Sequence, residues 1–100
     1  MNTLTLTEQV RTAHRESKLA ADYVAELAGM LPEGHPGRCH LDTAIRHVQA
    51  AAQLAEQAAA ALERCDNQAV AYAVMSGANA YRNAMNAADE AARHLMKGQS

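Results

Sequence analysis

The fold is decided by residues 41–62, which read LDTAIRHVQAAAQLAEQAAAAL. Apolar residues recur here at steps of three and four, which is the spacing of one face of an α-helix. Alanine has the highest helix propensity, loses no side-chain entropy in a helix, and lets two helix backbones approach closely. The stretch therefore predicts a long helix, over about residues 39–65, that packs on its neighbours through small side chains.

The same periodicity predicts two further helices, over about residues 5–30 and 68–97. The first is expected to begin at Thr5, because Thr5-x-x-Glu8 has the form of a capping box. Residues 31–38 are expected to form a loop, because they contain two prolines and two glycines. Gly98 is expected to stop the last helix.

Residues 66 and 67 are interpreted as a short turn between the second and third helices, with Asn67 as the N-cap of the third. Neither Asp66 nor Asn67 forbids a helix, and the stripe of small residues nearly keeps its phase across them. One continuous helix over residues 39–97 is therefore the alternative, and such a helix would almost compel dimerisation.

Each predicted helix carries one apolar seam with the spacing of coiled-coil-like packing. The sequence thus predicts a single all-α domain over residues 1–100, an antiparallel three-helix (up-down-up) bundle with Ala-rich seams. The expected inward positions are Leu6, Val10, Ala13, Ser17, Ala20, Val24, Leu27 and Leu31 in the first helix, Leu41, Ala44, Val48, Ala51, Ala55, Ala58 and Leu62 in the second, and Val70, Val74, Gly77, Tyr81, Ala84, Ala88, Ala91 and Leu95 in the third.

The composition indicates a small core. Alanine fills 24 of the 100 positions, Phe and Trp are absent, and Leu, Ile and Val together number 15. A buried alanine removes little apolar surface from water, at about 25 cal/mol per Å². A bundle of this kind gains from a second copy or a partner, so a homodimer formed through alanine-lined faces is expected.

Charge and segment composition favour a cytoplasmic protein that does not bind membrane and has no overall attraction for nucleic acid. The net charge is −2 and the isoelectric point is near 6.2, so the chain as a whole does not attract nucleic acid or anionic lipid. No apolar run approaches the roughly 20 residues of a membrane span, and residues 1–5 lack the order of a signal peptide. Two cysteines, Cys39 and Cys65, fit a reducing compartment and are interpreted as small structural residues at helix ends.

Four residues offer a transition-metal site as an alternative function: His35, Cys39, His40 and His47. Histidine and cysteine are typical metal ligands, but no Cys-x-x-Cys or His-x-x-x-His spacing is present. Neither a metal nor another cofactor is therefore expected. The chain also lacks Glu-x-x-His and places its acidic residues away from the seams, which argues against a di-iron centre. His94, four residues after Glu90, is interpreted as part of a solvated helical pair.

Arg11, Arg15 and Lys18 form a basic stripe on the first helix and offer nucleic-acid association as a second alternative. Glu8 and Asp22 bracket the stripe at helical pairing distances, which is typical of a solvated face. No aromatic side chain interleaves with these charges to stack on bases.

One face of the third helix is the strongest candidate for recognition. Three asparagines within eight residues cost about 1.5–2 kcal/mol relative to alanine in a helix, which a binding role would explain. A polar face that the helix simply tolerates is the alternative. With no paired catalytic acid and base, we expect a non-enzymatic adaptor, regulator or inhibitor that binds a larger intracellular protein through Tyr72, Met75, Asn79, Arg82, Asn83 and Asn86.

Overall fold

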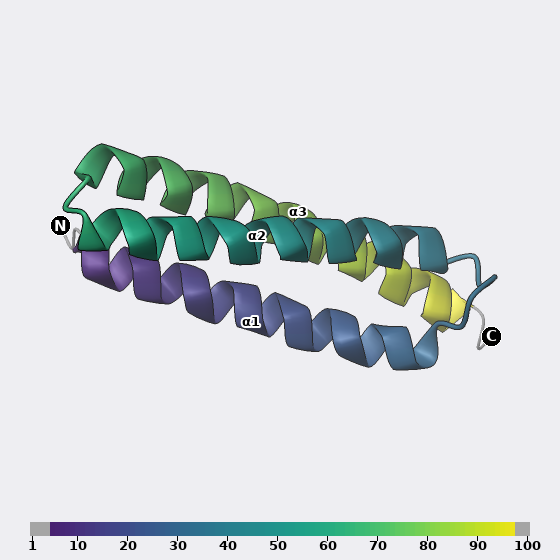
Figure 1. Cartoon of the computed structure of the whole chain (residues 1–100). Coiled ribbons are helices and arrows are strands. Elements are labelled where there is room, and N and C mark those ends of the chain that lie inside the picture. The colour runs from purple at the N-terminus through teal and green to yellow at the C-terminus, as the bar shows by residue number, and fades with distance from the viewer. Residues whose placement is uncertain (1–4, 98–100) are drawn as a thin grey trace, which may run out of the picture.

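The computed structural model describes residues 5–97, which form three helices and no strand. These are α1 (Leu6–Met30), α2 (Arg38–Glu63) and α3 (Asn67–Lys97), which pack lengthwise as a bundle (Figure 1). The prediction of an all-α bundle is thereby confirmed. Residues 1–4 and 98–100, including the predicted helix stop at Gly98, lie outside the described residues.

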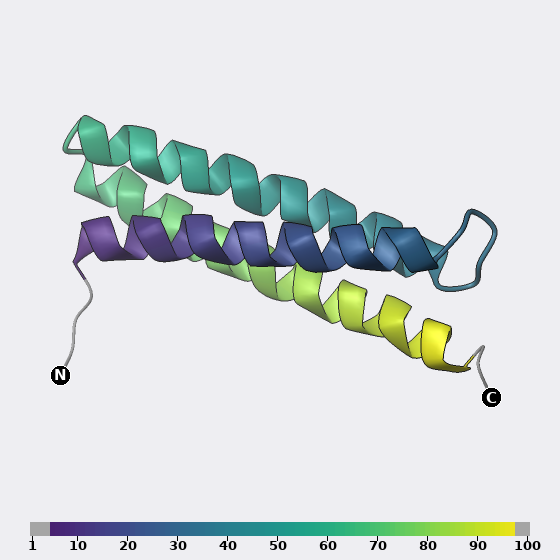
Figure 2. The ribbon, with the colours of Figure 1, turned by 90° about the horizontal axis from the view of Figure 1, so that it is seen from below.

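The two connections lie at opposite ends of an elongated body that measures 51 × 28 × 16 Å (Figure 1). The start of α1 lies at the end that holds the α2–α3 turn. The last turns of α3 and the loop of residues 31–37, which joins α1 to α2, lie at the other end of the body (Figure 2). This arrangement brings the first turn of α2 close to the last turns of α3.

The helix ends agree with the predicted capping at α1 and differ from it at α3. Thr5 Oγ1 accepts a hydrogen bond from the Glu8 amide at 3.1 Å, as the capping-box prediction requires. At α3 the cap is Asp66, whose Oδ1 accepts from the Ala69 amide at 3.2 Å, and Asn67 is already helical. The prediction of Asn67 as the N-cap is therefore wrong by one residue.

A Schellman motif ends α2 and shows that α2 and α3 are separate helices. The Asp66 amide donates to the Ala61 carbonyl at 3.0 Å, and the Cys65 amide donates to the Leu62 carbonyl at 3.1 Å. Cys65 has a φ of 58°, the left-handed conformation that closes this motif. The alternative of one helix over residues 39–97 is wrong, and the second helix spans Arg38–Glu63 instead of 39–65 because this motif ends it early.

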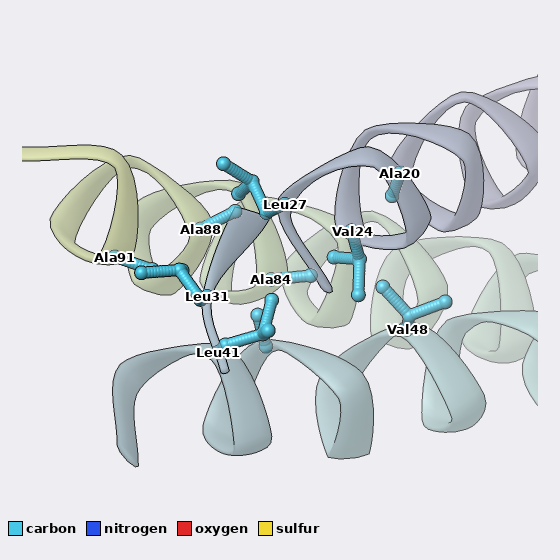
Figure 3. Packing of buried hydrophobic residues seen from close by; sticks show 10 residues of the cluster. Ala20, Val24, Leu27, Leu31, Leu41, Val48, Ala84, Ala88 and Ala91 are labelled. Carbon is cyan, nitrogen blue, oxygen red and sulfur yellow. The ribbon is translucent and has the colours of Figure 1, made fainter. Parts of the chain in front are cut away.

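The larger part of the core lies near the α1–α2 loop (Figure 3). Leu31 and Leu41 are fully buried and pack in one cluster with alanines of α3. The other labelled members of this cluster are Ala20, Val24, Leu27, Val48, Ala84, Ala88 and Ala91. Short α3 side chains let the leucines of α1 and α2 fill the space between the three helices.

A second cluster lies toward the α2–α3 turn, and small residues separate the two. It consists of Val10, Ala58, Ala61, Val70 and Ala73. Between the clusters, Gly77 is buried, and a Cβ built on it would lie 3.5 Å from Leu54 Cβ. The helices α2 and α3, which share the most extensive contact, therefore approach closely in the middle of the bundle.

The buried positions correct the predicted seams in detail. Three alanines are buried where the seams predicted their larger neighbours: Ala61 for Leu62, Ala73 for Val74, and Ala80 for Tyr81. The smallest residues occupy the lines of closest approach, and the larger side chains lie half-buried beside them. Leu6, Ala13 and Leu95 are also half-buried. The seam alanines of α2 and α3 are thus covered within one chain.

The backbone of Gly37 lies directly against α3 at the start of α2. A Cβ built on Gly37 would lie 2.9 Å from His94 Cβ and 3.1 Å from the Ala91 carbonyl oxygen. Gly37 has a φ of −80°, which any residue can adopt, so its need for glycine is steric. This contact fixes the position of the first turn of α2 relative to α3.

We expect the substitution Gly37→Ala to lower the free energy of unfolding by about 1–3 kcal/mol, because the added methyl group must displace the α3 backbone or the loop. Urea denaturation measures the change. The matched control is Gly29→Ala in α1, where an added Cβ meets nothing within 4 Å. This control should leave stability unchanged or raise it by up to about 1 kcal/mol. Equal effects of the two substitutions would contradict the close contact.

Replacement of Cys65 by glycine should stabilise the protein by about 1 kcal/mol, because glycine adopts the left-handed conformation without a steric penalty. The control Cys65→Ala removes the thiol but keeps a Cβ, so it should leave stability near that of the wild type. Thermal unfolding of the three proteins separates relief of backbone strain from loss of the thiol. A gain in the alanine variant equal to that in the glycine variant would assign the effect to the thiol.

Candidate functional site

The six residues predicted for partner binding are all exposed on α3. At 3.6 residues per turn they fall on the side of α3 that points away from its buried face. Tyr72 and Met75 are 71% and 72% exposed, which is high for large apolar residues. This surface, called the α3 strip below, consists of Tyr72, Met75, Asn79, Arg82, Asn83 and Asn86.

A shallow hollow of about 310 Å³ borders the α3 strip near the α2–α3 turn. Tyr72 belongs both to the strip and to the wall of the hollow. The sequence-based reasoning missed the contribution of α2, because the pairing of two helix surfaces depends on their register and not on spacing along one helix. The lining residues are Gln57, Ala60, Ala61, Arg64, Ala69, Tyr72 and Ala73.

The structure does not bring together the four residues of the predicted metal site. The imidazole Nδ1 of His35 accepts a hydrogen bond from the Gly37 amide at 3.0 Å, which holds this side chain to its own loop. The Cys39 thiol is exposed and lies 3.7 Å from the Pro36 carbonyl oxygen. His40 turns toward α3, where its ring stacks on that of His94, instead of along α2 toward His47.

Among residues 5–97, His40, Glu90 and His94 form the one group of three potential metal ligands with neighbouring ligand atoms. One ligand atom from each residue lies within 4.8 Å of the other two, and all three side chains are half-buried. The two imidazole rings stack with centroids 5.0 Å apart and planes inclined by 22°. This group is called the histidine cluster below.

Glu90 takes part in an ion pair that the sequence-based reasoning did not identify. Its Oε1 accepts from Arg93 Nη1 at 2.8 Å, whereas the sequence suggested a solvated pairing with His94. The spacing from Glu90 to His94 placed the two residues on one side of α3. Only the fold shows that His40, fifty residues earlier, completes the group.

The basic stripe and the cysteines lie on the surface. Arg11, Arg15 and Lys18 are exposed on α1, and this face also carries the exposed Asp22. Cys39 and Cys65 are exposed free thiols, at the start of α2 and just after its end. The mixed charge around the stripe is typical of a solvated helix face.

A hydrogen bond between α1 and α3 perturbs the pKa of a tyrosine. The Tyr23 hydroxyl donates to Asp89 Oδ1 at 3.1 Å. Burial raises the pKa of Tyr23 above its usual value of 10.0, and the hydrogen bond and negative charge of Asp89 raise it further. The bundle therefore favours the protonated hydroxyl of Tyr23.

In the described part of the chain, no helix is both long and apolar enough to cross a membrane. Comparisons with protein-family models, curated proteins and solved structures found no match to this chain.

Stability should fall at alkaline pH through Tyr23. A tyrosine with a raised pKa in the folded state stabilises the fold fully below its unfolded pKa of about 10, and this contribution is lost as the pH rises through the folded value. Urea unfolding at about pH 9 and about pH 11 measures the loss. We expect a smaller loss in Tyr23→Phe than in the wild type. The exposed Tyr72→Phe is the control, and an equal loss in both variants would remove the role assigned to Tyr23.

Proposed function

We propose that the chain is a non-enzymatic binding protein that acts through the α3 strip on a larger protein partner, as an adaptor, regulator or inhibitor. The observation that carries this proposal is the exposure of Tyr72 and Met75, at 71% and 72%, in line with three asparagines on one outer face. Tyrosine, methionine and arginine are enriched at protein interfaces, and asparagine side chains both donate and accept hydrogen bonds.

The chemistry of this surface defines the partner that it fits. An apolar side chain of the partner would enter the hollow beside Tyr72, which is walled mainly by alanine side chains. Arg64 at the hollow and Arg82 on the α3 strip are exposed cations, so they favour carboxylates on the opposite surface. The asparagines on either side of Arg82 would pair with backbone or amide groups of the partner. We therefore infer a partner surface that is acidic opposite Arg64 and Arg82 and apolar opposite the hollow.

The proposal includes the finer features of the predicted architecture. An antiparallel up-down-up bundle is supported by connections that lie at opposite ends of the body (Figure 1). A cytoplasmic location is supported by two exposed free thiols, which persist most readily in a reducing compartment.

A homodimer is proposed to form through an outer face, because the thin body leaves Leu19 and Met30 of α1 more than half exposed. Light scattering of the reduced protein tests the dimer, and a monomeric mass would exclude it.

The partner is tested by placing a photo-crosslinking amino acid at Met75 in cells that produce the chain. We expect one discrete adduct with a larger protein, identified by mass spectrometry. The control position is Gln53, an exposed residue of α2 outside the strip and the hollow. Equal labelling at both positions, or an adduct only with a second copy of the chain, would contradict the proposal.

Substitution of Asn79, Asn83 and Asn86 by alanine should change stability and binding in opposite directions. Helix propensity predicts a gain in the free energy of unfolding of about 1.5–2 kcal/mol, since asparagine is a poor helix former. The affinity for the crosslinked partner should fall, because the hydrogen-bonding groups are gone. Tyr72→Ala should weaken binding by about 2 kcal/mol or more if this side chain anchors the interface. Unchanged affinity in both variants would show that the partner binds elsewhere.

A further inference from the structure

The histidine cluster lies where the first turn of α2 meets the last turns of α3, at the opposite end of the bundle from the hollow beside Tyr72. We propose that His40, Glu90 and His94 bind one divalent transition-metal ion, with Zn²⁺ as the best match. The ion would join the two helices through one ligand from α2 and two from α3. The site includes no residue of the α3 strip, and its ligand Glu90 lies one helical turn beyond Asn86 at the end of the strip.

The donor set favours zinc over the hard cations. Two imidazole nitrogens and one carboxylate oxygen form a ligand set that zinc uses in proteins, with a fourth position left for water. Ca²⁺ needs six or more oxygen ligands, and Mg²⁺ prefers oxygen ligands in octahedral geometry, so neither suits a site with two nitrogens. Among residues 5–97, no further acidic or histidine ligand joins the group.

Short side-chain movements bring the ligands to coordination distance. In a tetrahedral site with bonds of about 2.0–2.1 Å, the ligand atoms lie about 3.4 Å apart. The present separations are at most 4.8 Å, so side-chain torsions alone can close the site. The imidazole planes must turn out of their stacked arrangement, in which they are inclined by 22°, so that their lone pairs converge. Loss of this stacking is therefore a signature of metal binding.

The backbone that carries the ligands is held in place by contacts that do not involve metal. Gly37 packs against the Cβ of His94, which positions the start of α2 against α3. Arg38 Nη1 donates to the Leu31 carbonyl at 2.8 Å, and its Nε pairs with Asp42 at 3.3 Å, so the first turn of α2 is anchored on both sides. Preorganised ligands reduce the ordering cost of binding.

Arg93 orients the third ligand. It binds Oε1 of Glu90 at 2.8 Å and leaves the other carboxylate oxygen available to the metal. Carboxylate ligands in metal sites are commonly held by such a hydrogen bond. We therefore assign Arg93 a positioning role, and Glu90 the role of ligand.

The test is isothermal titration of Zn²⁺ into the untagged full-length chain, together with elemental analysis after dialysis. We expect one ion per chain. His40→Ala and His94→Ala should each weaken binding by about tenfold or more, since even the loss of an outer hydrogen bond to a ligand costs about 10–100-fold. His47→Ala, which changes a half-buried histidine on α2 outside the group, is the matched control and should bind like the wild type.

The unfolding temperature in the presence of Zn²⁺ distinguishes loss of a metal ligand from misfolding of a variant. Zn²⁺ should raise the unfolding temperature of the wild type and of His47→Ala, but not of Glu90→Gln. In the unaltered chain, Cu²⁺ should broaden the imidazole NMR signals of His40 and His94 before those of His14, an exposed histidine on α1. Absence of saturable Zn²⁺ binding would overturn the proposal. Binding lost in Cys39→Ser and His47→Ala but kept in His94→Ala would also overturn it, in favour of the loop residues.

Discussion

Alanine and glycine at the helix contacts set how closely the three backbones approach one another. Gly77 lies near Leu54 in the middle of the bundle, and Gly37 lies against His94 at one end. Because these contacts leave little space, the two core clusters need only a few leucines and valines to be filled. The same closeness brings His40 beside His94 and leaves the larger α3 side chains, such as Tyr72, on the outside. Core, histidine cluster and outer surface therefore all depend on the small residues.

Helix periodicity and end signals are local properties of the sequence, and they predicted three helices while leaving one continuous helix over residues 39–97 as the alternative. Thr5 caps α1 as its spacing to Glu8 predicts. The seams were correct where alanine repeats at regular steps, and they shifted by one residue where a small and a large residue are neighbours, as at Ala80 and Tyr81. Periodicity treats both residues as apolar, whereas packing between close backbones favours the smaller.

The histidine cluster could be predicted only in part. Glu90 and His94 are one turn apart on a helix, so their proximity is visible in the sequence. Their partner His40 was instead grouped with its sequence neighbours His35 and Cys39. Which histidine His40 approaches depends on how the loop of residues 31–37 packs against α3. The close contact of Gly37 with α3 sets this packing. No local pattern encodes such a contact. The exposure of the α3 strip, in contrast, follows directly from the position of its residues opposite the seam.

Asp66 lies between α2 and α3 and makes a hydrogen bond to each helix. Its amide closes the Schellman motif of α2, and its carboxylate caps α3. Asp66 therefore links the end of one helix to the beginning of the other, since a change in its backbone conformation affects both hydrogen bonds. The connection is also very short, so closing it costs little chain entropy. We expect α2 and α3 to form first as a cooperative hairpin in folding, with α1 docking onto an already assembled pair.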